Sequence, residues 1–445
     1  MATDNKARVL DMLSRMSAPQ YQSIEELAPH LRIAESRVRQ FIPRSPLRRS
    51  EWLSELTGGD IWLKLEGLNP TGSFKVRGAI AALAARLERR EAESGGSGVK
   101  GQLQIVAASA GNHAQGVAYA ARAMGCQAHI FLPAGTPLIK QIQTKRLGAQ
   151  VVVGGDGLDA AFDAALEFVA QTPGAEFMHP FNDFDVIMGQ STCLTECFEQ
   201  FESATARPAK DIDAFLCAIG GGGLAAGSGL AMKLFGGGQV IGIEQENFDS
   251  AKVSLESGNW SPSSGRGETS LADGIRVRLI GKQDFEFMRG TVNEVALMSD
   301  NDLVGAITGL CENENVIAEG AGAAGVAFML HDPKRFKGKT AIACVCGGNI
   351  DTQVLSRVLS RGLGVTGRMM RVVLNLGDKP GQLARALGKL AETDANLLEV
   401  HHDRTYSKAN VGTVEVELSL ETKDFDHQKV LLAKLENAGF SPRIL

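Results

Sequence analysis

Short apolar runs alternate with longer amphipathic stretches through most of the chain. Between "DIWLKLEG", which begins at residue 60, and "TAIACVCGG", which begins at residue 340, runs such as "QLQIVAASA" and "QAHIFLP" each precede apolar residues at helical spacing. Strands that are apolar on both faces are typical of a parallel sheet covered by helices on each side. The chain holds more of these units than one sheet takes. We therefore expect an α/β fold with two lobes, each an open twisted parallel sheet.

The pattern changes towards both ends of the chain. Segments "ARVLDMLSRM" and "SIEELAPHLRIAESRVRQFI" are amphipathic at helical spacing, and after "SRGLGVTGRMM" the order becomes strand, helix, strand, strand, helix, strand, as in ferredoxin-like domains. The longest irregular stretch, residues 253–281, is rich in Ser and Gly and predicts a long loop. We expect a helical extension at 1–30, a main domain at 31–364 with a smaller lobe nested at about 76–180, and a C-terminal domain at 369–445.

Composition narrows the class of protein. The 445 residues are 44% hydrophobic and 22% charged, and a net charge of -5 without a basic stripe argues against nucleic-acid binding. No apolar run approaches the roughly 20 residues that span a bilayer, and the start "MATDNKARVLDML" does not resemble a secretory signal. We expect a cytoplasmic protein with a small-molecule partner and no membrane partner. Its 7 scattered cysteines favour reduced thiols.

A row of glycines follows one predicted strand. The segment "AIGGGGLAAGSGLAMKL" begins at Ala218, directly after the apolar run "DAFLC", and continues as a helix pattern. Consecutive glycines let several backbone N–H groups converge on one anion at a helix N-terminus, so this loop is expected to bind a phosphate. The unbroken row does not follow GxGxxG, and the lysine of a P-loop is missing. A plain flexible turn is the alternative.

Two further turns end predicted strands and contain polar or small residues. They are "SAGNHAQG", which begins at Ser109, and "CVCGGNID", which begins at Cys344. Ligands bind at the carboxyl ends of strands in open α/β sheets. Lys75, in "NPTGSFKVRGA", stands between a turn and a predicted helix, which is unusual for a surface lysine. A reactive amine, a phosphate site and a carboxylate site together fit pyridoxal 5'-phosphate with an amino-acid substrate.

The motifs also carry a family resemblance. "PTGSFKVRGA", "SAGNHAQG", "GGGGLAAG", "LADGI", "AEGAGAA" and "CGGNID", in this order, resemble the pyridoxal-phosphate threonine/serine dehydratases, and in particular the threonine ammonia-lyases, over about residues 31–364. The resemblance implies the tryptophan-synthase-β-like fold of fold type II enzymes. From Arg371 onward the chain resembles a single ACT regulatory domain.

The resemblance implies roles for individual residues. Lys75 forms the internal Schiff base and later removes the α-proton. Phe74 lies near the cofactor ring, Asn112 contacts the phenolic oxygen, and Cys346 faces the pyridine nitrogen as a neutral thiol that favours elimination over transamination. The phosphate is bound by the backbone of Gly220, Gly221, Gly222, Gly223 and Leu224. The substrate carboxylate is held by Ser109, Ala110, Gly111, Asn112 and His113, although the residues alone favour a structural His113 over a catalytic base.

Some positions depart from the family pattern or concern regulation. Ala110 stands where related serine racemases have a serine, so we expect poor racemisation. Glu244 lies where some relatives bind a divalent cation, but Phe248 and Ser250 match the other positions only partly, so a metal is left open. In ACT domains an amino acid commonly binds at the first turn, which here holds the residues Asp378, Lys379, Pro380 and Gly381.

The resemblance implies a function with two alternatives. The leading one is α,β-elimination of L-threonine, with L-serine as a second candidate substrate, to 2-oxobutanoate (or pyruvate) and ammonia. Isoleucine or valine would act as effector at paired ACT domains, in a homodimer or homotetramer. The first alternative is a lyase or β-replacement enzyme of the same fold acting on another amino acid such as 3-hydroxyaspartate. The second is a non-catalytic amino-acid sensor, against which the complete set of cofactor residues argues.

Overall fold

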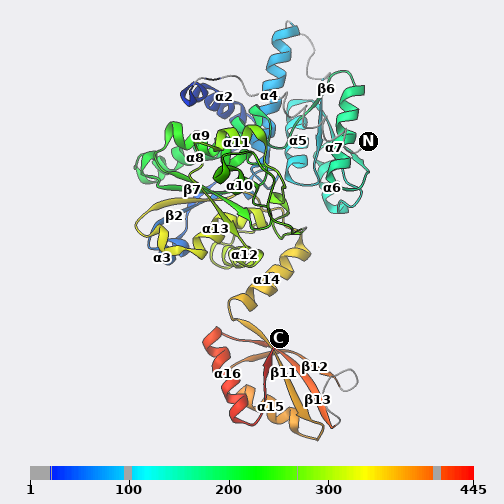
Figure 1. The fold of residues 1–445 in the computed structure, drawn as a ribbon, viewed down its shortest axis with the longest axis vertical. Coiled ribbons are helices and arrows are strands. Elements are labelled where there is room, and N and C mark those ends of the chain that lie inside the picture. Colours follow the sequence, from blue (N-terminus) through cyan, green and yellow to red (C-terminus); the bar gives the residue numbers. More distant parts are fainter. Residues whose placement is uncertain (1–20, 22, 95–102, 268, 404–411) are drawn as a thin grey trace. The chain divides into compact units, whose positions relative to one another are not determined.

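The computed structural model describes residues 21, 23–94, 103–267, 269–403 and 412–445. Most of the expected helical extension at 1–30 lies outside these residues. The chain divides into two compact units, residues 1–350 and 351–445, and each is described by itself (Figure 1). The sequence assigns residues 351–364 to the main domain, whereas the structure groups them with the second unit.

The larger lobe of the first unit is built on a six-stranded sheet. Only β1 (Leu47–Arg49) is antiparallel to its neighbour β2, whereas the other neighbouring pairs are parallel. Every residue of β7 and β10 is buried, as expected for strands with helices on both faces. In spatial order after β1, the strands are β2 (Asp60–Leu65), β10 (Thr340–Val345), β7 (Ala214–Ala218), β8 (Gln239–Gln245) and β9 (Glu294–Met298).

The smaller lobe is a four-stranded parallel sheet of order β5-β4-β3-β6. Its apolar core includes Val106, Phe131 and Phe177 from the strands and Ala161 and Ala165 from helix α7. The two parallel sheets confirm the predicted two-lobed α/β fold. The strands are β3 (Gln104–Ala108), β4 (Gln127–Leu132), β5 (Gln150–Val153) and β6 (Ala175–Phe177), and the helices are α5 (Asn112–Met124), α6 (Leu138–Arg146) and α7 (Gly157–Gln171).

Helix α4 (Lys75–Ser94) connects the two lobes. It packs against α5 of the smaller lobe and α8 (Phe184–Thr205) of the larger lobe. A Cβ on Gly116 of α5 would lie only 3.1 Å from the carbonyl of Lys75, so the two helices meet closely at the first residue of α4. The start of α4 is therefore held at the junction of the lobes.

The remaining helices of the larger lobe surround its sheet. One correction concerns the predicted loop at 253–281, because residues 253–257 belong to α10. The buried carboxylate of Glu244 accepts the backbone N–H groups of Ala251 and Lys252, which stabilises the first turn of α10 through a contact that local sequence does not reveal. These helices are α2 (Ala28–Arg39), α3 (Glu51–Thr57), α9 (Gly223–Phe235), α10 (Ser250–Ser257), α11 (Lys282–Met288), α12 (Asp300–Glu314) and α13 (Gly320–His331).

The second unit has the predicted ferredoxin-like order. Its antiparallel sheet has the order β12-β13-β11-β14, and alternate residues such as Val372, Leu374, Val416 and Leu418 form a core with helices α15 and α16. This period-two burial explains why the pattern could be predicted. The elements are α14 (Thr352–Val365), β11 (Met369–Gly377), α15 (Gln382–Ala391), β12 (Asn396–Asp403), β13 (Thr413–Glu421), α16 (Phe425–Asn437) and β14 (Arg443–Ile444).

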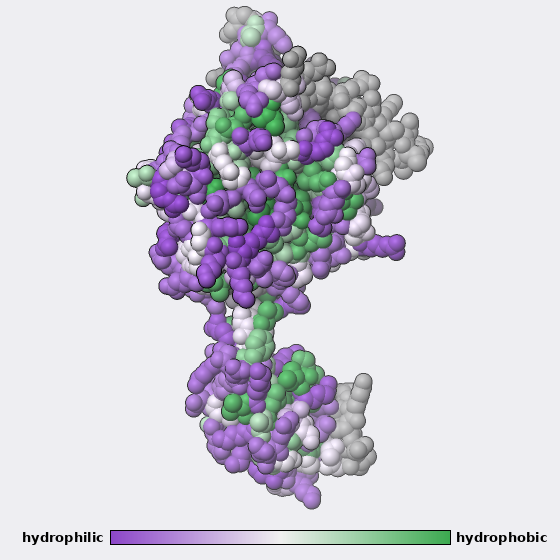
Figure 2. All heavy atoms as spheres, turned by 60° about the vertical axis from the view of Figure 1, so that its left-hand side comes forward, coloured by the Kyte–Doolittle hydropathy of each residue, from purple (hydrophilic) through white to green (hydrophobic). Residues whose placement is uncertain are grey.

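The surface shows hydrophilic residues over both units, with hydrophobic side chains in smaller groups between them (Figure 2). Within the described part of the chain, no helix combines the length and the apolar character needed to cross a membrane.

Candidate active site

Lys75 is the first residue of α4 and lies at the junction of the lobes. Its Nζ donates a hydrogen bond to the carbonyl oxygen of Pro180 at 2.9 Å. Burial lowers the pKa of Lys75 to about 8, although Asp284, Cys346 and Glu319 act in the opposite direction. At pH 7 an amine with this pKa is unprotonated in roughly a tenth of the molecules, far more than an ordinary lysine, so Lys75 is suited to act as a nucleophile and base.

Two aromatic rings flank the Lys75 amine. Nζ lies 5.2 Å from the ring centroid of Phe74 and 5.9 Å from that of Phe181. The Phe181 ring also covers the glycine row, since a Cβ on Gly221 would overlap it. Glycine is therefore required at this position by a close approach.

The glycine row joins β7 to α9. Gly222 has a φ of 109°, in the left-handed region, and the N–H of Gly281 donates to the carbonyl of Gly221 at 2.9 Å. The first N–H groups of a helix have no intrahelical partner and carry a partial positive charge. Because α9 begins at Gly223, the loop presents such donors at its end. This arrangement fits a phosphate group.

Asn112 is the first residue of α5 and belongs to a chain of side-chain hydrogen bonds. Its Nδ2 donates to Oε1 of Glu319 at 2.7 Å, and Asn349 Nδ2 donates to its Oδ1 at 2.7 Å. These contacts orient the amide and leave a second N–H on Nδ2 for a ligand oxygen. Burial, with a smaller contribution from Asp273, raises the pKa of Glu319 to about 7. Glu319 was missed as a site residue, although the motif "AEGAGAA" contains it.

Cys346 directly follows β10. The backbone N–H of Phe74 donates to the carbonyl of Cys346 at 3.0 Å, which brings this turn against the residue before Lys75. Its thiol donates to the carbonyl oxygen of Ala321 at 3.4 Å. Burial raises the pKa of the Cys346 thiol well above its ordinary range, so the thiol is neutral.

Residues Ser109–His113 form the turn between β3 and α5. The backbone N–H of Gly111 donates to Oγ of Ser109 at 3.2 Å. His113 is buried, and its Nε2 donates to the carbonyl oxygen of Met178 at 3.0 Å. Burial and the nearby Lys75 lower the pKa of His113 to about 3, so the ring is neutral and already engaged. A structural role for His113 agrees with these contacts.

Comparison with known proteins decides the family. A family model described as "Pyridoxal-phosphate dependent enzyme" matches residues 38–348. The chain belongs to this family. The cofactor of the family is therefore pyridoxal phosphate, and the glycine row and the Lys75 amine agree with its phosphate and its carbonyl group.

Full-length relatives agree with this assignment. The chain is 39% identical over 417 residues to an L-threonine ammonia-lyase of Thermotoga maritima, covering 93% of this chain and 98% of the relative. It is 36% identical over 416 residues to an L-threonine ammonia-lyase of Geobacter sulfurreducens, with 93% and 98% coverage. The structure of the processed form of threonine deaminase isoform 2 from Solanum lycopersicum matches with a TM-score of 0.68 and 31% identity, over 77% of this chain and 95% of that one.

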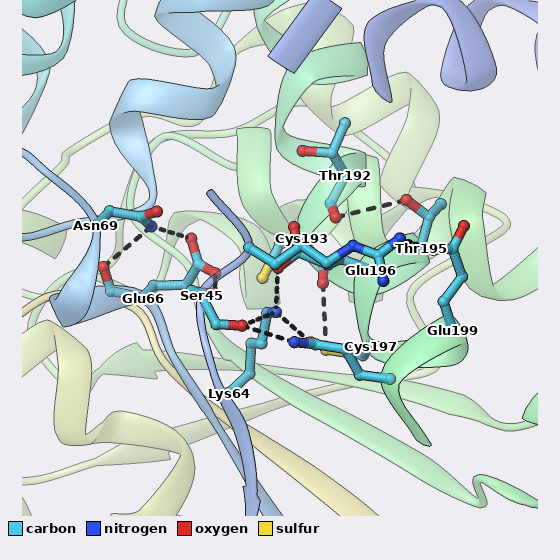
Figure 3. Close-up of polar contacts among 12 residues, drawn as sticks. Ser45, Lys64, Glu66, Asn69, Thr192, Cys193, Thr195, Glu196, Cys197 and Glu199 are labelled. Atoms are coloured by element: carbon cyan, nitrogen blue, oxygen red, sulfur yellow. Dashed lines mark hydrogen bonds and ion pairs between the residues drawn. The ribbon is translucent and has the colours of Figure 1, made fainter. Parts of the chain in front are cut away.

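A buried ion cluster is centred on Arg77, in the first turn of α4. Arg77 Nε and Nη1 contact Glu66 Oε2 at 2.7 Å and Glu196 Oε2 at 2.8 Å, and Lys64 Nζ contacts Glu196 Oε1 at 2.7 Å. Figure 3 shows Lys64, Glu66 and Glu196 within this network. Although burial opposes ionisation, the Arg77 guanidinium lowers the pKa of Glu66 to about 2. The cluster fixes the position of the turn that carries Lys75.

Two predicted sites lie apart from Lys75 in the sequence. Both carboxylate oxygens of Glu244 accept backbone N–H groups of α10, and burial raises its pKa to about 8. The sequence leaves a cation at Glu244 open, and the described residues contain no group of three His, Cys, Asp or Glu side chains that could hold a metal. In the second unit, the exposed residues 378–381 form the turn between β11 and α15, where Gly381 has a φ of 86°.

Proposed function

We propose that this chain is an L-threonine ammonia-lyase that forms 2-oxobutanoate and ammonia, and that it also accepts L-serine. The observation that carries the proposal is the amine of Lys75, whose pKa is lowered to about 8 and which lies 5.9 Å from the centroid of the Phe181 ring that covers the glycine row. The names of the Thermotoga and Geobacter relatives support threonine as the substrate. The filled cofactor positions argue against a non-catalytic sensor.

Each part of the cofactor has a suitable partner in this proposal. When bound, pyridoxal phosphate withdraws electrons from the substrate α-carbon. Phe74 would pack beside the ring, the second N–H of Asn112 would donate to the phenolic oxygen, and the neutral Cys346 thiol would face the ring nitrogen. The phosphate would be held by the backbone N–H groups of Gly220, Gly221, Gly222, Gly223 and Leu224.

Lys75 acts on the substrate as well as on the cofactor. Its amine removes the α-proton, and the Pro180 carbonyl that accepts its hydrogen bond in this structure orients it. The turn at Ser109–Asn112 holds the substrate carboxylate through the Ser109 hydroxyl and its backbone N–H groups. Because Cys346 is a neutral group, it does not balance a positive charge on the ring nitrogen, which favours elimination over transamination.

We also propose that the second unit is an ACT regulatory domain that binds isoleucine or valine at residues 378–381. The alignment with the Thermotoga relative covers 93% of this chain and leaves about 7% unmatched. The second unit, with 95 of the 445 residues, is about 21% of the chain. Most of this unit is therefore shared with that L-threonine ammonia-lyase. Binding between paired ACT domains requires at least a homodimer, and it controls activity by favouring one of two conformations.

The deciding experiment is a substrate panel with purified protein. L-Threonine, L-serine and 3-hydroxyaspartate are assayed for release of the 2-oxo acid and of ammonia, with the Lys75→Ala variant as the control. We expect the highest kcat/KM for L-threonine. A higher value for 3-hydroxyaspartate would assign the chain to the alternative lyase, and no turnover of any amino acid would contradict an enzymatic function.

A further inference from the structure

Asp284 is a buried acid for which the proposed reaction has no role. It is the third residue of α11 and is fully buried. Neither of its carboxyl oxygens accepts a hydrogen bond from another described residue. A buried carboxylate without partners is strongly destabilising, so its presence requires an explanation.

The carboxyl group of Asp284 lies against the glycine row. A Cβ on Gly222 would come within 2.7 Å of the Asp284 Cβ, and a Cβ on Gly223 would lie 3.5 Å from its Oδ1. A Cβ on Gly281 would overlap its Oδ2. The unpaired carboxyl group therefore borders the loop and the first residue of α9, where the phosphate is expected.

Two charged groups act on Asp284 from neighbouring elements. The ammonium of Lys75 on α4 favours its ionised form, and the carboxylate of Asp183, which precedes α8, disfavours it. Asp183 is itself paired with Arg86 at 2.6 Å. Burial is the largest influence, and it raises the pKa of Asp284 well above its ordinary range.

The negative charge of a phosphate ligand favours the protonated form of Asp284. A phosphate ester carries about -1.5 to -2 charges at neutral pH, and an ionised Asp284 beside it would repel it. A protonated carboxyl group has one O–H donor, which turns the repulsion into a charge-assisted hydrogen bond.

We propose that Asp284 is an uncharged carboxylic acid that donates a hydrogen bond to the phosphate of the bound cofactor. The proposal rests on the pyridoxal-phosphate assignment and is independent of the substrate. From α11, Asp284 then adds a side-chain donor to a phosphate site whose other donors are backbone N–H groups of the glycine row.

The test measures the affinity of apoprotein for pyridoxine 5'-phosphate and for pyridoxine. The two probes differ only in the phosphate, and neither has a carbonyl group that reacts with Lys75. We expect Asp284→Ala to weaken pyridoxine 5'-phosphate roughly 10- to 100-fold, as for a hydrogen bond to a charged group, and to leave pyridoxine unchanged. Asp284→Asn keeps a donor and should bind both probes nearly as the parent does.

Glu286→Gln is the matched control, since Glu286 is on the same helix, is 45% exposed and pairs with Arg289. It should change neither affinity. Circular dichroism of each apoprotein checks that the variants are folded. As pH rises, the parent should lose affinity for pyridoxine 5'-phosphate relative to Asp284→Asn, because only the parent gains a negative charge beside the phosphate.

Three results would overturn the proposal. Equal weakening by Asp284→Asn and Asp284→Ala would show that the carboxylate acts as an anion, for example as the partner of Lys75. Unchanged binding in Asp284→Ala would show that the side chain does not contact the phosphate. Equal loss of pyridoxine and pyridoxine 5'-phosphate would place the effect in the fold of the pocket. Threonine turnover tests the proposed function separately.

Discussion

Two groups of buried charges in the first unit differ in how completely they are paired. In the ion cluster of Lys64, Glu66, Arg77 and Glu196, cations and carboxylates are 2.7–2.8 Å apart. Beside Lys75, Asp284 has no partner from another described residue, and Glu319 has a pKa raised to about 7. Buried charges that pair with one another hold the backbone around them in place, whereas buried ionisable groups without a charged partner are typical of a site that binds a ligand.

The largest expected effect is on turnover. Lys75→Ala should abolish elimination and the absorbance of the bound cofactor at roughly 410 nm, because the proposed Schiff base forms on the Lys75 amine. The apoprotein should stay folded, with a stability within about 1 kcal/mol of the parent, since Lys75 has no buried ion pair to lose. Absorbance spectra, steady-state assays and urea unfolding measure the three quantities. Normal turnover in this variant would contradict the assignment of Lys75.

A substitution in the ion cluster should lower the free energy of unfolding, in contrast to Lys75→Ala, which should abolish turnover. Arg77→Met leaves the carboxylates of Glu66 and Glu196 buried without their shared partner, which should cost about 3–5 kcal/mol. Arg89→Met on the same helix is the control, because the Arg89 side chain is 56% exposed and its ion pair with Asp185 should contribute less than about 1 kcal/mol. Urea unfolding of both apoproteins gives the comparison. Similar losses in the two variants would refute a special role for the cluster.

Glu319, near Lys75, and Glu66, in the ion cluster, should make the free energy of unfolding depend on pH in different ways. Its pKa is raised from 4.5 to about 7, so the folded protein binds the extra proton and loses stability as pH rises through this range. Glu66, with a pKa of about 2, contributes stability that is lost only as pH falls below its ordinary value of 4.5. Between pH 4.5 and 7 the free energy of unfolding should therefore fall by about 3 kcal/mol less in Glu319→Gln than in the parent. Parallel stability curves for parent and variant apoprotein would contradict this pKa.

The next prediction concerns regulation by the second unit. Removing residues 367–445 should leave an active lyase that no longer responds to isoleucine or valine. The coupling lost should be about 1–3 kcal/mol, which corresponds to a 5- to 150-fold change in substrate affinity. Titration of both amino acids at sub-saturating threonine measures it. An identical response in the full-length and shortened proteins would remove the second unit from regulation.

The smallest expected effect concerns Ala110, in the turn between β3 and α5. Ala110→Ser introduces a hydroxyl that can donate or accept a proton, so the ratio of serine racemisation to elimination should rise. We expect a change of about 1 kcal/mol in the relative barriers, or roughly fivefold in the ratio. Chiral chromatography of residual serine, together with the pyruvate assay, measures it. An unchanged ratio in a folded, cofactor-loaded variant would refute the role of this position.

Much of the architecture could be predicted because it follows from local patterns. The two lobes and the order of elements in the second unit appear as apolar periods, which depend on residues close together in the chain. The glycine row and the turn before Lys75 are continuous motifs, and the structure places both beside half-buried aromatic rings, those of Phe181 and Phe74. The predicted role of a single residue such as Asn112 stays a prediction, supported by the amide orientation that Glu319 and Asn349 impose.

Other features required the tertiary structure, because they depend on groups that are distant in the sequence. Arg77 and Glu196 are separated by 119 positions, and α10 is stabilised by the carboxylate of Glu244 from a neighbouring strand. Asp284 has the sequence context of an ordinary acid in a short amphipathic helix. The tertiary structure shows that Asp284 is buried against the glycine row and that its carboxyl oxygens have no hydrogen-bond partner from another described residue. Burial and pairing depend on all the residues that pack around a charge, and most of these are distant in the sequence.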